Sequence, residues 1–335
     1  MRKTNLKPVR RLWQEQLVRF APYIVSGLIL IVLPLAVPAY LQSMLTKVLI
    51  FAIFAMSLNL IWGYTGLISL GHAAFFGVAA YTTALLIMRY GIESFWISAP
   101  CGILMAGLIA AFFGIIALRV SGIYFLLVTL ALGQLLYYIA VAWRPVTRGT
   151  DGIIGIPRPD LGIPWLTWNA TSFYFFVLVI FVICFILLHR VANSPFGLAL
   201  QGIREDEPRM RCLGYNTWLY KYVAFIVAGM FAGVAGILFA HFFGAIVPMH
   251  ASVTNSTVVL LMVILGGTRV IFGPAIGAVV VVLLEYFASI YVPARWPLIL
   301  GAVFVIAVMY LRGGIGFYLV RLWRRVSYQY GSAKS

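Results

Sequence analysis

The sequence predicts an all-α membrane protein, a polytopic transmembrane helix bundle of about ten spans with a broken glycine-rich helix region and a short cytoplasmic helix. Three observations predict this fold. Hydrophobic residues make up 63% of the 335 residues and charged residues only 10%, whereas soluble domains are about 25% charged. Apolar runs long enough to cross a bilayer recur along the whole chain. Lys and Arg gather in the short segments between these runs.

The spans follow from the apolar runs, because a helix needs about 20 apolar residues to cross a hydrocarbon core of about 30 Å. Residues 48–88 contain no Asp, Glu, Lys or Arg and are long enough for two crossings, with a turn expected at 62–66. A second charge-free stretch, 222–268, needs a turn near 248–255. The ten predicted spans are 23–39, 44–62, 66–88, 95–118, 122–143, 172–189, 222–245, 254–268, 271–290 and 296–311.

Basic residues set the expected orientation, because cytoplasmic segments of membrane proteins carry an excess of Lys and Arg. With the N-terminus inside, eighteen basic residues fall on the cytoplasmic side: Arg2, Lys3, Lys7, Arg10, Arg11, Arg19, Arg119, Arg190, Arg204, Arg209, Arg211, Lys221, Arg269, Arg312, Arg321, Arg324, Arg325 and Lys334. Five fall outside, namely Arg89, Arg144, Arg148, Arg158 and Arg295, and Lys47 lies near a membrane edge. Both termini are therefore predicted to be cytoplasmic, with a basic segment 1–22, one transmembrane domain 23–311 and a basic tail 312–335.

Two connections are longer than simple turns. The outward loop 144–171 is rich in Gly and Pro and carries Trp165 and Trp168, which suit a membrane–water boundary. The cytoplasmic loop 190–221 holds a dense charge cluster ending at Gly214, which predicts a short helix. With Glu205, Asp206 and Glu207 near its start, the acids would lie where the helix dipole favours them. Composition alone leaves a solvated loop and a docking element equally open.

Several chemistries are not indicated. The chain has no Gly-Lys dipeptide, so a phosphate-binding loop for ATP is not predicted. The three cysteines lie apart, and neither a metal site nor a cofactor nor an enzyme active site is predicted. The excess of Lys and Arg reports topology, so we expect no nucleic-acid partner. Glu285 is the one acid inside a predicted span, and it either serves function or reaches the headgroup region.

Glycines gather around residues 63–77, where they favour either close helix packing or a broken helix that lines a pathway. Packing is the more common use of such glycines. His72 either lines that pathway or is a neutral histidine bonded to backbone. The candidate pathway residues are Gly66, Ser69, Gly71, His72 and Tyr81.

Four blocks of the sequence carry a resemblance to a known family. They are 57–81, 122–132 with 150–157, 193–207, and 265–277. Together they resemble the permeases of branched-chain amino-acid ABC transporters, and the longer outward loop is similar to the LivM-type subunit. The resemblance implies that Arg204, Glu205, Asp206, Glu207, Arg211 and Gly214 belong to a coupling helix that docks into an ATPase. The chain departs from the family at Arg209, Met210 and Cys212, where small residues are usual.

The resemblance also implies an assembly in the bacterial cytoplasmic membrane. It comprises a second permease subunit, two ABC ATPase subunits and an extracytoplasmic substrate-binding protein, and it would import an amino acid through the bilayer. Permeases for urea, short amides or other amino acids share these blocks, so the substrate stays open. A secondary transporter is the alternative from another class, although the predicted spans offer almost no ionisable groups for ion coupling.

Overall fold

The computed structural model describes residues 27, 30–34, 36–162, 167–268, 270–291, 296–310, 313–318 and 321. Within these residues, seven helices are long and apolar enough to cross a membrane. They are α2 (Ala39–Thr65), α3 (His72–Tyr90), α4 (Phe95–Ala117), α5 (Ile123–Ala142), α7 (Ala170–Asn193), α10 (Thr217–Phe243) and α12 (Gly273–Tyr291). Two shorter helices, α11 (Val253–Gly266) and α13 (Trp296–Tyr310), lie beside α12 in the sequence. The protein is an integral membrane helix bundle.

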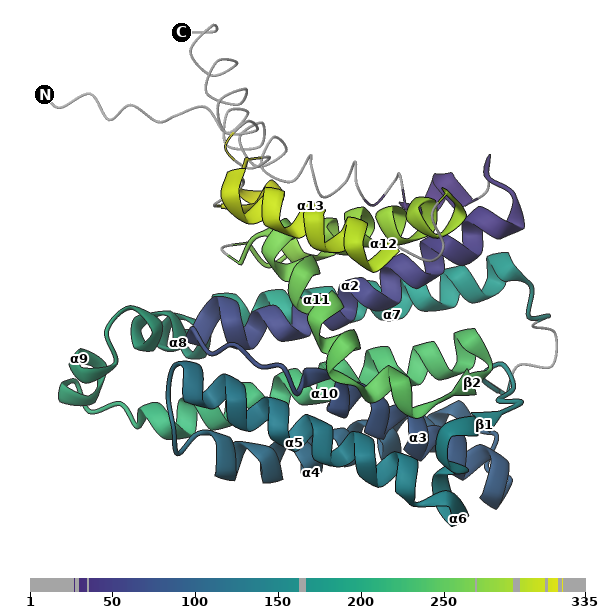
Figure 1. Ribbon diagram of the computed structural model, residues 1–335, viewed down its shortest axis with the longest axis horizontal. Helices are drawn as coiled ribbons and strands as arrows, with labels where there is room; N and C mark the ends of the chain where they lie inside the picture. The colour runs from purple at the N-terminus through teal and green to yellow at the C-terminus, as the bar shows by residue number, and fades with distance from the viewer. Residues whose placement is uncertain are drawn as a thin grey trace, which may run out of the picture.

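Helices α2 and α10 form the centre of the bundle. In the most apolar 18-residue stretch of α2, 83% of the residues are buried inside the protein, and in the corresponding stretch of α10 the fraction is 67%. Helix α10 packs against α2, α3 and α4, and α2 also packs against α7 and α12 (Figure 1). A Cβ atom on Gly233 would lie 2.7 Å from Ala106 Cβ on α4, which is too close for two methyl groups. The glycines of α10 therefore serve close helix packing, as the sequence predicts for small residues in membrane bundles.

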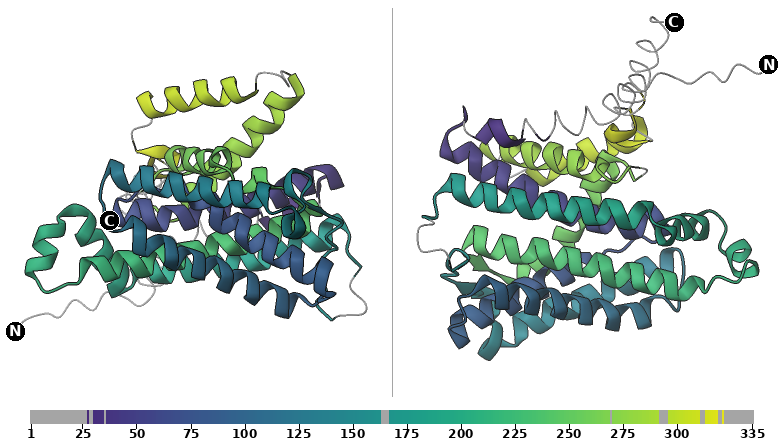
Figure 2. Two further views of the ribbon diagram at one scale, coloured as in Figure 1. Left: turned by 60° about the horizontal axis from the view of Figure 1, so that its bottom comes forward. Right: turned by 180° about the vertical axis from the view of Figure 1, so that it is seen from behind.

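The two ends of the bundle carry different irregular structure (Figures 1 and 2). At one end, the short helices α8 (Pro195–Glu205) and α9 (Glu207–Cys212) project beyond the long helices. The opposite end holds α6 (Arg144–Thr147), η1 (Gly149–Asp151), β1 (Ile153–Ile154) and β2 (Ala245–Ile246). The short helix η2 (Pro248–Ala251) packs inside the bundle, where a Cβ on Gly77 of α3 would lie 2.4 Å from Ala251 Cβ. Strands β1 and β2 are antiparallel, with Ile153 opposite Ile246, so the loop 144–171 is fastened to the segment that follows α10.

Most predicted spans match a helix within a few residues. The first one, 23–39, is described only at 27, 30–34 and 36–39, and of these residues 27, 30–34, 36 and 39 are helical. The span predicted at 254–268 corresponds to α11, whose 14 residues reach only about 21 Å. Figure 1 shows α11 running steeply across the direction of α7 and α10. The span predicted at 296–311 corresponds to α13, whose 15 residues reach only about 22 Å. Of the ten predicted spans, the described residues therefore contain seven helices long enough to cross a membrane.

The turn predicted at 62–66 is wrong, because α2 continues to Thr65. The Thr65 hydroxyl donates to the carbonyl of Ile61 at 2.6 Å, which keeps the last turn helical. Gly66 then ends the helix with a left-handed φ of 78°, which glycine adopts without a Cβ clash. The chain is non-helical over 66–71, and α3 begins at His72, six residues later than the predicted span.

The loop 190–221 is also shorter than predicted, because both flanking helices extend into it. Helix α7 continues to Asn193, and α10 begins at Thr217 rather than at 222. Asn216 explains the early start, since its side chain accepts a hydrogen bond from the Leu219 amide at 3.2 Å and caps α10. The hydropathy of the sequence did not predict the first turn of α10, because residues 218–221 include polar and charged groups, which lie at the edge of the bundle.

Candidate functional site

The predicted coupling helix is two helices, and the prediction of a single one is wrong. The chain breaks at Asp206, whose backbone is extended and whose carboxylate accepts a hydrogen bond from the Arg209 amide at 3.0 Å. Asp206 is thus the N-cap of α9, and Glu207 lies in the first turn of that helix, where an acid is favourable. Glu205 instead ends α8, at the pole of the helix dipole that disfavours an acid.

Glu207 is the centre of a network that fastens α9 to the start of α10. Its carboxylate accepts hydrogen bonds from Arg211 Nη2 at 2.7 Å, Lys221 Nζ at 2.5 Å and Thr217 Oγ1 at 2.9 Å. Burial raises the pKa of Glu207, but the bonds from Lys221, Arg211 and Thr217 outweigh it and leave the pKa below the ordinary value of 4.5. The carboxylate is therefore charged at neutral pH, and it holds two cations from separate helices.

Gly214 ends α9 in the way the sequence predicts for a glycine after a helix. Its φ is 87°, its amide donates to the Arg211 carbonyl at 3.0 Å, and the Tyr215 amide donates to the Met210 carbonyl at 3.1 Å. This pair of bonds is a Schellman motif, which needs a left-handed residue at the position of Gly214. The end of α9 is therefore sharply defined.

Met210 explains one of the departures from the family pattern. Its side chain is buried with Ala199 and Ile203 of α8, and a Cβ on Gly202 would lie 2.8 Å from Met210 Sδ. Met210 thus packs α9 onto α8 and is not available to a partner. Arg209 and Cys212 point the other way and are exposed. The outer face of α9 therefore carries these two residues, and beside it Leu213 is 67% exposed.

Arg204 connects this loop to the glycine-rich segment. Its guanidinium donates from Nη1 to the carbonyl oxygen of Gly63, in the last turn of α2. That carbonyl is one of the last four in the helix, which have no partner within the helix. Arg204 Cγ would also lie 3.3 Å from a Cβ on Gly66. The two regions that the sequence singles out separately are in direct contact at this point.

The segment 66–71 runs back into the bundle rather than across its surface. His72, the first residue of α3, bonds through Nε2 to Ser57 Oγ at 2.8 Å and stacks on Phe54. Ser57 precedes the end of α2 by eight residues, which is about 12 Å along the helix. The chain therefore covers about this depth without forming a helix. In a membrane, such backbone is tolerated where it is buried in protein or lines a water-filled cavity.

Polar groups around this segment lack partners. Ser69 Oγ and His72 Nδ1 are buried, and within the described residues neither makes a hydrogen bond. The same holds for both side-chain atoms of Asn59 in α2, which lies instead on the side of Gly63 that faces the Thr268 carbonyl. Leaving a buried polar group unpaired is costly, so such groups call for an explanation, such as water or a ligand. Asn59 was missed by the sequence analysis, although an amide inside a charge-free span is a signal that could have identified it.

Gly71 has a packing role that the sequence analysis did not separate from a pathway role. A Cβ at this position would overlap the Thr129 carbonyl of α5, and a Cβ on Gly133 would lie 2.9 Å from Gly71 Cα. The start of α3 therefore touches α5 backbone to backbone. The Leu70 amide donates to Thr129 Oγ1 at 3.3 Å and strengthens the same contact.

Tyr81 is not brought together with the other candidate pathway residues. It follows His72 by nine positions, which at 3.6 residues per turn places it on the opposite face of α3. Its side chain packs with Ile153, Ile246 and Ala240 near the β1–β2 end. The structure thus joins Gly66, Ser69, Gly71 and His72 in one segment and leaves Tyr81 apart.

Thr217 is a further residue of the α8–α9 loop network, because its hydroxyl bridges Glu207 and Arg211. No pattern in the sequence identified it.

The chain is similar to known permeases over most of its length. Residues 40–311 match the family model described as branched-chain amino acid transport system / permease component. The LivM high-affinity branched-chain amino acid permease of Escherichia coli is 32% identical over 71% of this chain and 61% of its own length. LivH of Salmonella typhimurium is 23% identical, over 77% of this chain and 88% of its own.

A third relative carries a different name. LsrC, an autoinducer 2 import system permease of Escherichia coli, is 25% identical over 67% of this chain and 66% of its own length. The chain spans only 61% of the length of the LivM protein it matches. No solved structure is detectably similar to it. Because the family model covers most of the sequence, from the start of α2 to the end of α13, the chain belongs to the family of branched-chain amino acid transport system permease components.

Proposed function

We propose that this chain is one of two membrane-spanning subunits of an ATP-driven importer in the bacterial cytoplasmic membrane. Its substrate would be a branched-chain or related hydrophobic amino acid, as the names of the LivM and LivH relatives suggest. The chain itself is a transporter subunit and not an enzyme. ATP is hydrolysed by two partner ATPase subunits, and an extracytoplasmic binding protein delivers the substrate.

The contact between Arg204 and Gly63 is the observation that carries the mechanism. The α8–α9 loop projects from the end of the bundle and is held rigid by Glu207 and the Gly214 cap. A force applied to such a loop by an ATPase reaches the last turn of α2 through Arg204. The next residues are the segment 66–71, so the loop is coupled to the broken region of the bundle.

The segment 66–71 is the proposed substrate route. Its support is the non-helical backbone at the depth of Ser57, together with the unpaired polar groups of Ser69 and His72. Gly66 and Gly71 mark its two ends. Tyr81 faces away from His72 and would touch the route only near the β1–β2 end. We propose that this end faces outward and that α8 and α9 face the cytoplasm, on the basis of the charge asymmetry.

Two alternatives to this proposal concern the cargo and the energy source. The LsrC relative is named for autoinducer 2 import, so family membership alone does not fix the cargo, and urea, short amides and other amino acids stay open. A secondary transporter would use an ion gradient instead of ATP. The deciding experiment is uptake by vesicles that contain the chain with its partner permease and ATPases. Uptake that requires internal ATP and survives loss of the ion gradients supports the importer, whereas uptake that follows a gradient without ATP rejects it.

A further inference from the structure

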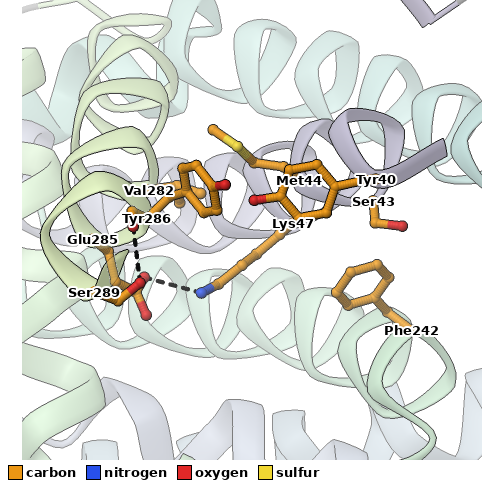
Figure 3. A pocket seen from close by; sticks show the side chains of 9 residues that line it. All are labelled: Tyr40, Ser43, Met44, Lys47, Phe242, Val282, Glu285, Tyr286 and Ser289. Atoms are coloured by element: carbon orange, nitrogen blue, oxygen red, sulfur yellow. Dashed lines mark hydrogen bonds and ion pairs between the residues drawn. The ribbon is translucent and has the colours of Figure 1, made fainter. Parts of the chain in front are cut away.

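A pocket of about 240 Å³ lies between α2, α10 and α12 toward the β1–β2 end of the bundle (Figure 3). It is lined by Tyr40, Ser43, Met44, Lys47, Phe242, Val282, Glu285, Tyr286 and Ser289. Pockets for drug-sized molecules hold roughly 300–1,000 Å³. This one is therefore sized for a smaller ligand.

The pocket contains both signs of charge. Lys47 Nζ lies 3.0 Å from Glu285 Oε2, and the two side chains are 30% and 31% exposed. Lys47 is eight residues into α2, about 12 Å along the helix, and Glu285 is six residues, about 9 Å, from the end of α12. Ionisable groups inside membrane spans are costly and generally functional. Glu285 is thus paired across helices rather than simply directed at the headgroups.

Each charged group keeps unused bonding capacity. An ammonium has three donors and a carboxylate about four acceptor sites, and across the described residues each of these two groups makes a single side-chain hydrogen bond, the one to the other. A molecule with an ammonium and a carboxylate on the same carbon atom would pair with both groups at once. The four charges would then alternate in sign around the contact, which is a favourable arrangement.

The rest of the pocket wall supplies an apolar surface. Met44 of α2, Phe242 of α10 and Val282 of α12 line it beside the ion pair, and Figure 3 shows Phe242 across the pocket from Glu285. Tyr40 and Tyr286 place their rings 5.5 Å apart at the same site. Apolar walls with a few convergent polar groups are typical of small-ligand sites.

From these contacts we propose that the Lys47–Glu285 pocket binds the zwitterion of an aliphatic α-amino acid. The ligand carboxylate pairs with Lys47, its ammonium pairs with Glu285, and its side chain lies against Met44, Phe242 and Val282. The site is separate from the segment 66–71 and would receive the substrate before that segment does. This inference rests on the proposed function, because it deepens the substrate class of the importer.

The test measures binding to the full chain in lipid nanodiscs without any ATPase. The probes are L-leucine, 4-methylpentanoic acid, which lacks the ammonium, and 3-methylbutylamine, which lacks the carboxylate. L-leucine should bind at least about tenfold more tightly than either analogue, since each analogue leaves one charged group unpaired. Lys47→Met and Glu285→Gln should each weaken L-leucine binding by a similar factor. Arg89→Met, which removes an exposed charge at the same end, should leave it unchanged.

The double variant Lys47→Glu/Glu285→Lys distinguishes an ion pair that binds a ligand from one that only links two helices. It retains the link between α2 and α12 but reverses the order of the charges beside the same apolar wall. Exchanging the ammonium and carboxylate around Cα converts one enantiomer into the other, so the preference between L- and D-leucine should reverse. The proposal is overturned if wild type does not bind L-leucine, if both analogues bind as tightly as L-leucine, or if the exchange leaves the enantiomer preference unchanged. Uptake that needs no ATP would instead contradict the proposed function as an ATP-driven importer, but it would not change the result of the L-leucine binding measurement.

Discussion

The guanidinium of Arg204 in α8 donates to the carbonyl oxygen of Gly63 in the last turn of α2. This bond crosses from the projecting α8–α9 loop to the helix that leads into the segment 66–71. It pairs a charged donor with a carbonyl that the helix itself leaves without a partner. We propose that movement of the loop reaches the end of α2 through this bond, together with the packing of α8 on α2.

Removal of that bond should weaken transport more than it weakens the fold. Arg204→Ala should lower ATP-dependent uptake by about tenfold, the effect expected from loss of one charged hydrogen bond. Arg204→Lys keeps the charge but not the planar fork, so it should give an intermediate rate. Arg190→Ala removes an exposed charge from the end of α7 and should transport as wild type does. Normal uptake by Arg204→Ala would show that the contact transmits nothing.

Acid should release α9 from α10. The pKa of Glu207 is lower in the folded protein than its ordinary 4.5, so its contribution to stability is complete above 4.5 and is lost as the pH falls through the lower folded value. Hydrogen exchange of the α9 amides, corrected for intrinsic rates, should therefore stay constant from neutral pH to 4.5 and rise below it. Glu207→Gln should remove this step, and a step of equal size in that variant would assign it to another acid.

Variants at Gly71 and Ser69 distinguish a packing role of the segment 66–71 from its proposed role as the substrate route. Gly71→Leu should lower the thermal stability of the purified chain, because its side chain would overlap the Thr129 carbonyl of α5. Ser69→Cys changes little volume and should fold normally. Its thiol should react with a small, water-soluble methanethiosulfonate during ATP turnover and much more slowly at rest. Equal and slow reaction in both conditions would indicate that Ser69 lies in a closed protein interior.

The sequence predicted the helical class and most helix positions because long apolar runs are a strong signal. It could not find the break at Asp206, since a capping carboxylate and an acid inside a helix look alike in composition. The start of α3 was misplaced because Leu67, Ile68 and Leu70 are as apolar as helical residues, although the chain there is not helical. The Lys47–Glu285 pair was also out of reach, because its partners are separated by 238 positions.

The orientation can be read from cysteine labelling in intact cells. Native Cys212 on α9 is exposed and should react with a membrane-impermeant maleimide only after the cells are permeabilised. Thr150, in the loop 144–171, is exposed as well. A Thr150→Cys/Cys212→Ser variant should therefore react in intact cells. The opposite pattern at these two sites would mean that the bundle is inverted.

The proposed role of the α8–α9 loop in energy coupling can be tested through the charges around Glu207. Glu207→Lys/Arg211→Glu keeps the pair within α9 but puts two lysines together, at 207 and 221, where the native bond is 2.5 Å. Adding Lys221→Glu gives every pair in the network opposite signs again. The double variant should thus detach α9 from α10, and the triple variant should reattach it.

The most direct measurement compares ATP hydrolysis and substrate uptake in the same vesicles, which contain the chain, its partner permease and the ATPases. We predict that the double variant inserts and assembles normally but hydrolyses ATP without matching uptake, with the uptake per ATP reduced by about tenfold. The triple variant should recover most of the wild-type ratio. If the double variant keeps the wild-type ratio of uptake to hydrolysis, and crosslinks between Cys212 and the ATPase are absent, the α8–α9 loop is a passive connector and energy enters this subunit elsewhere.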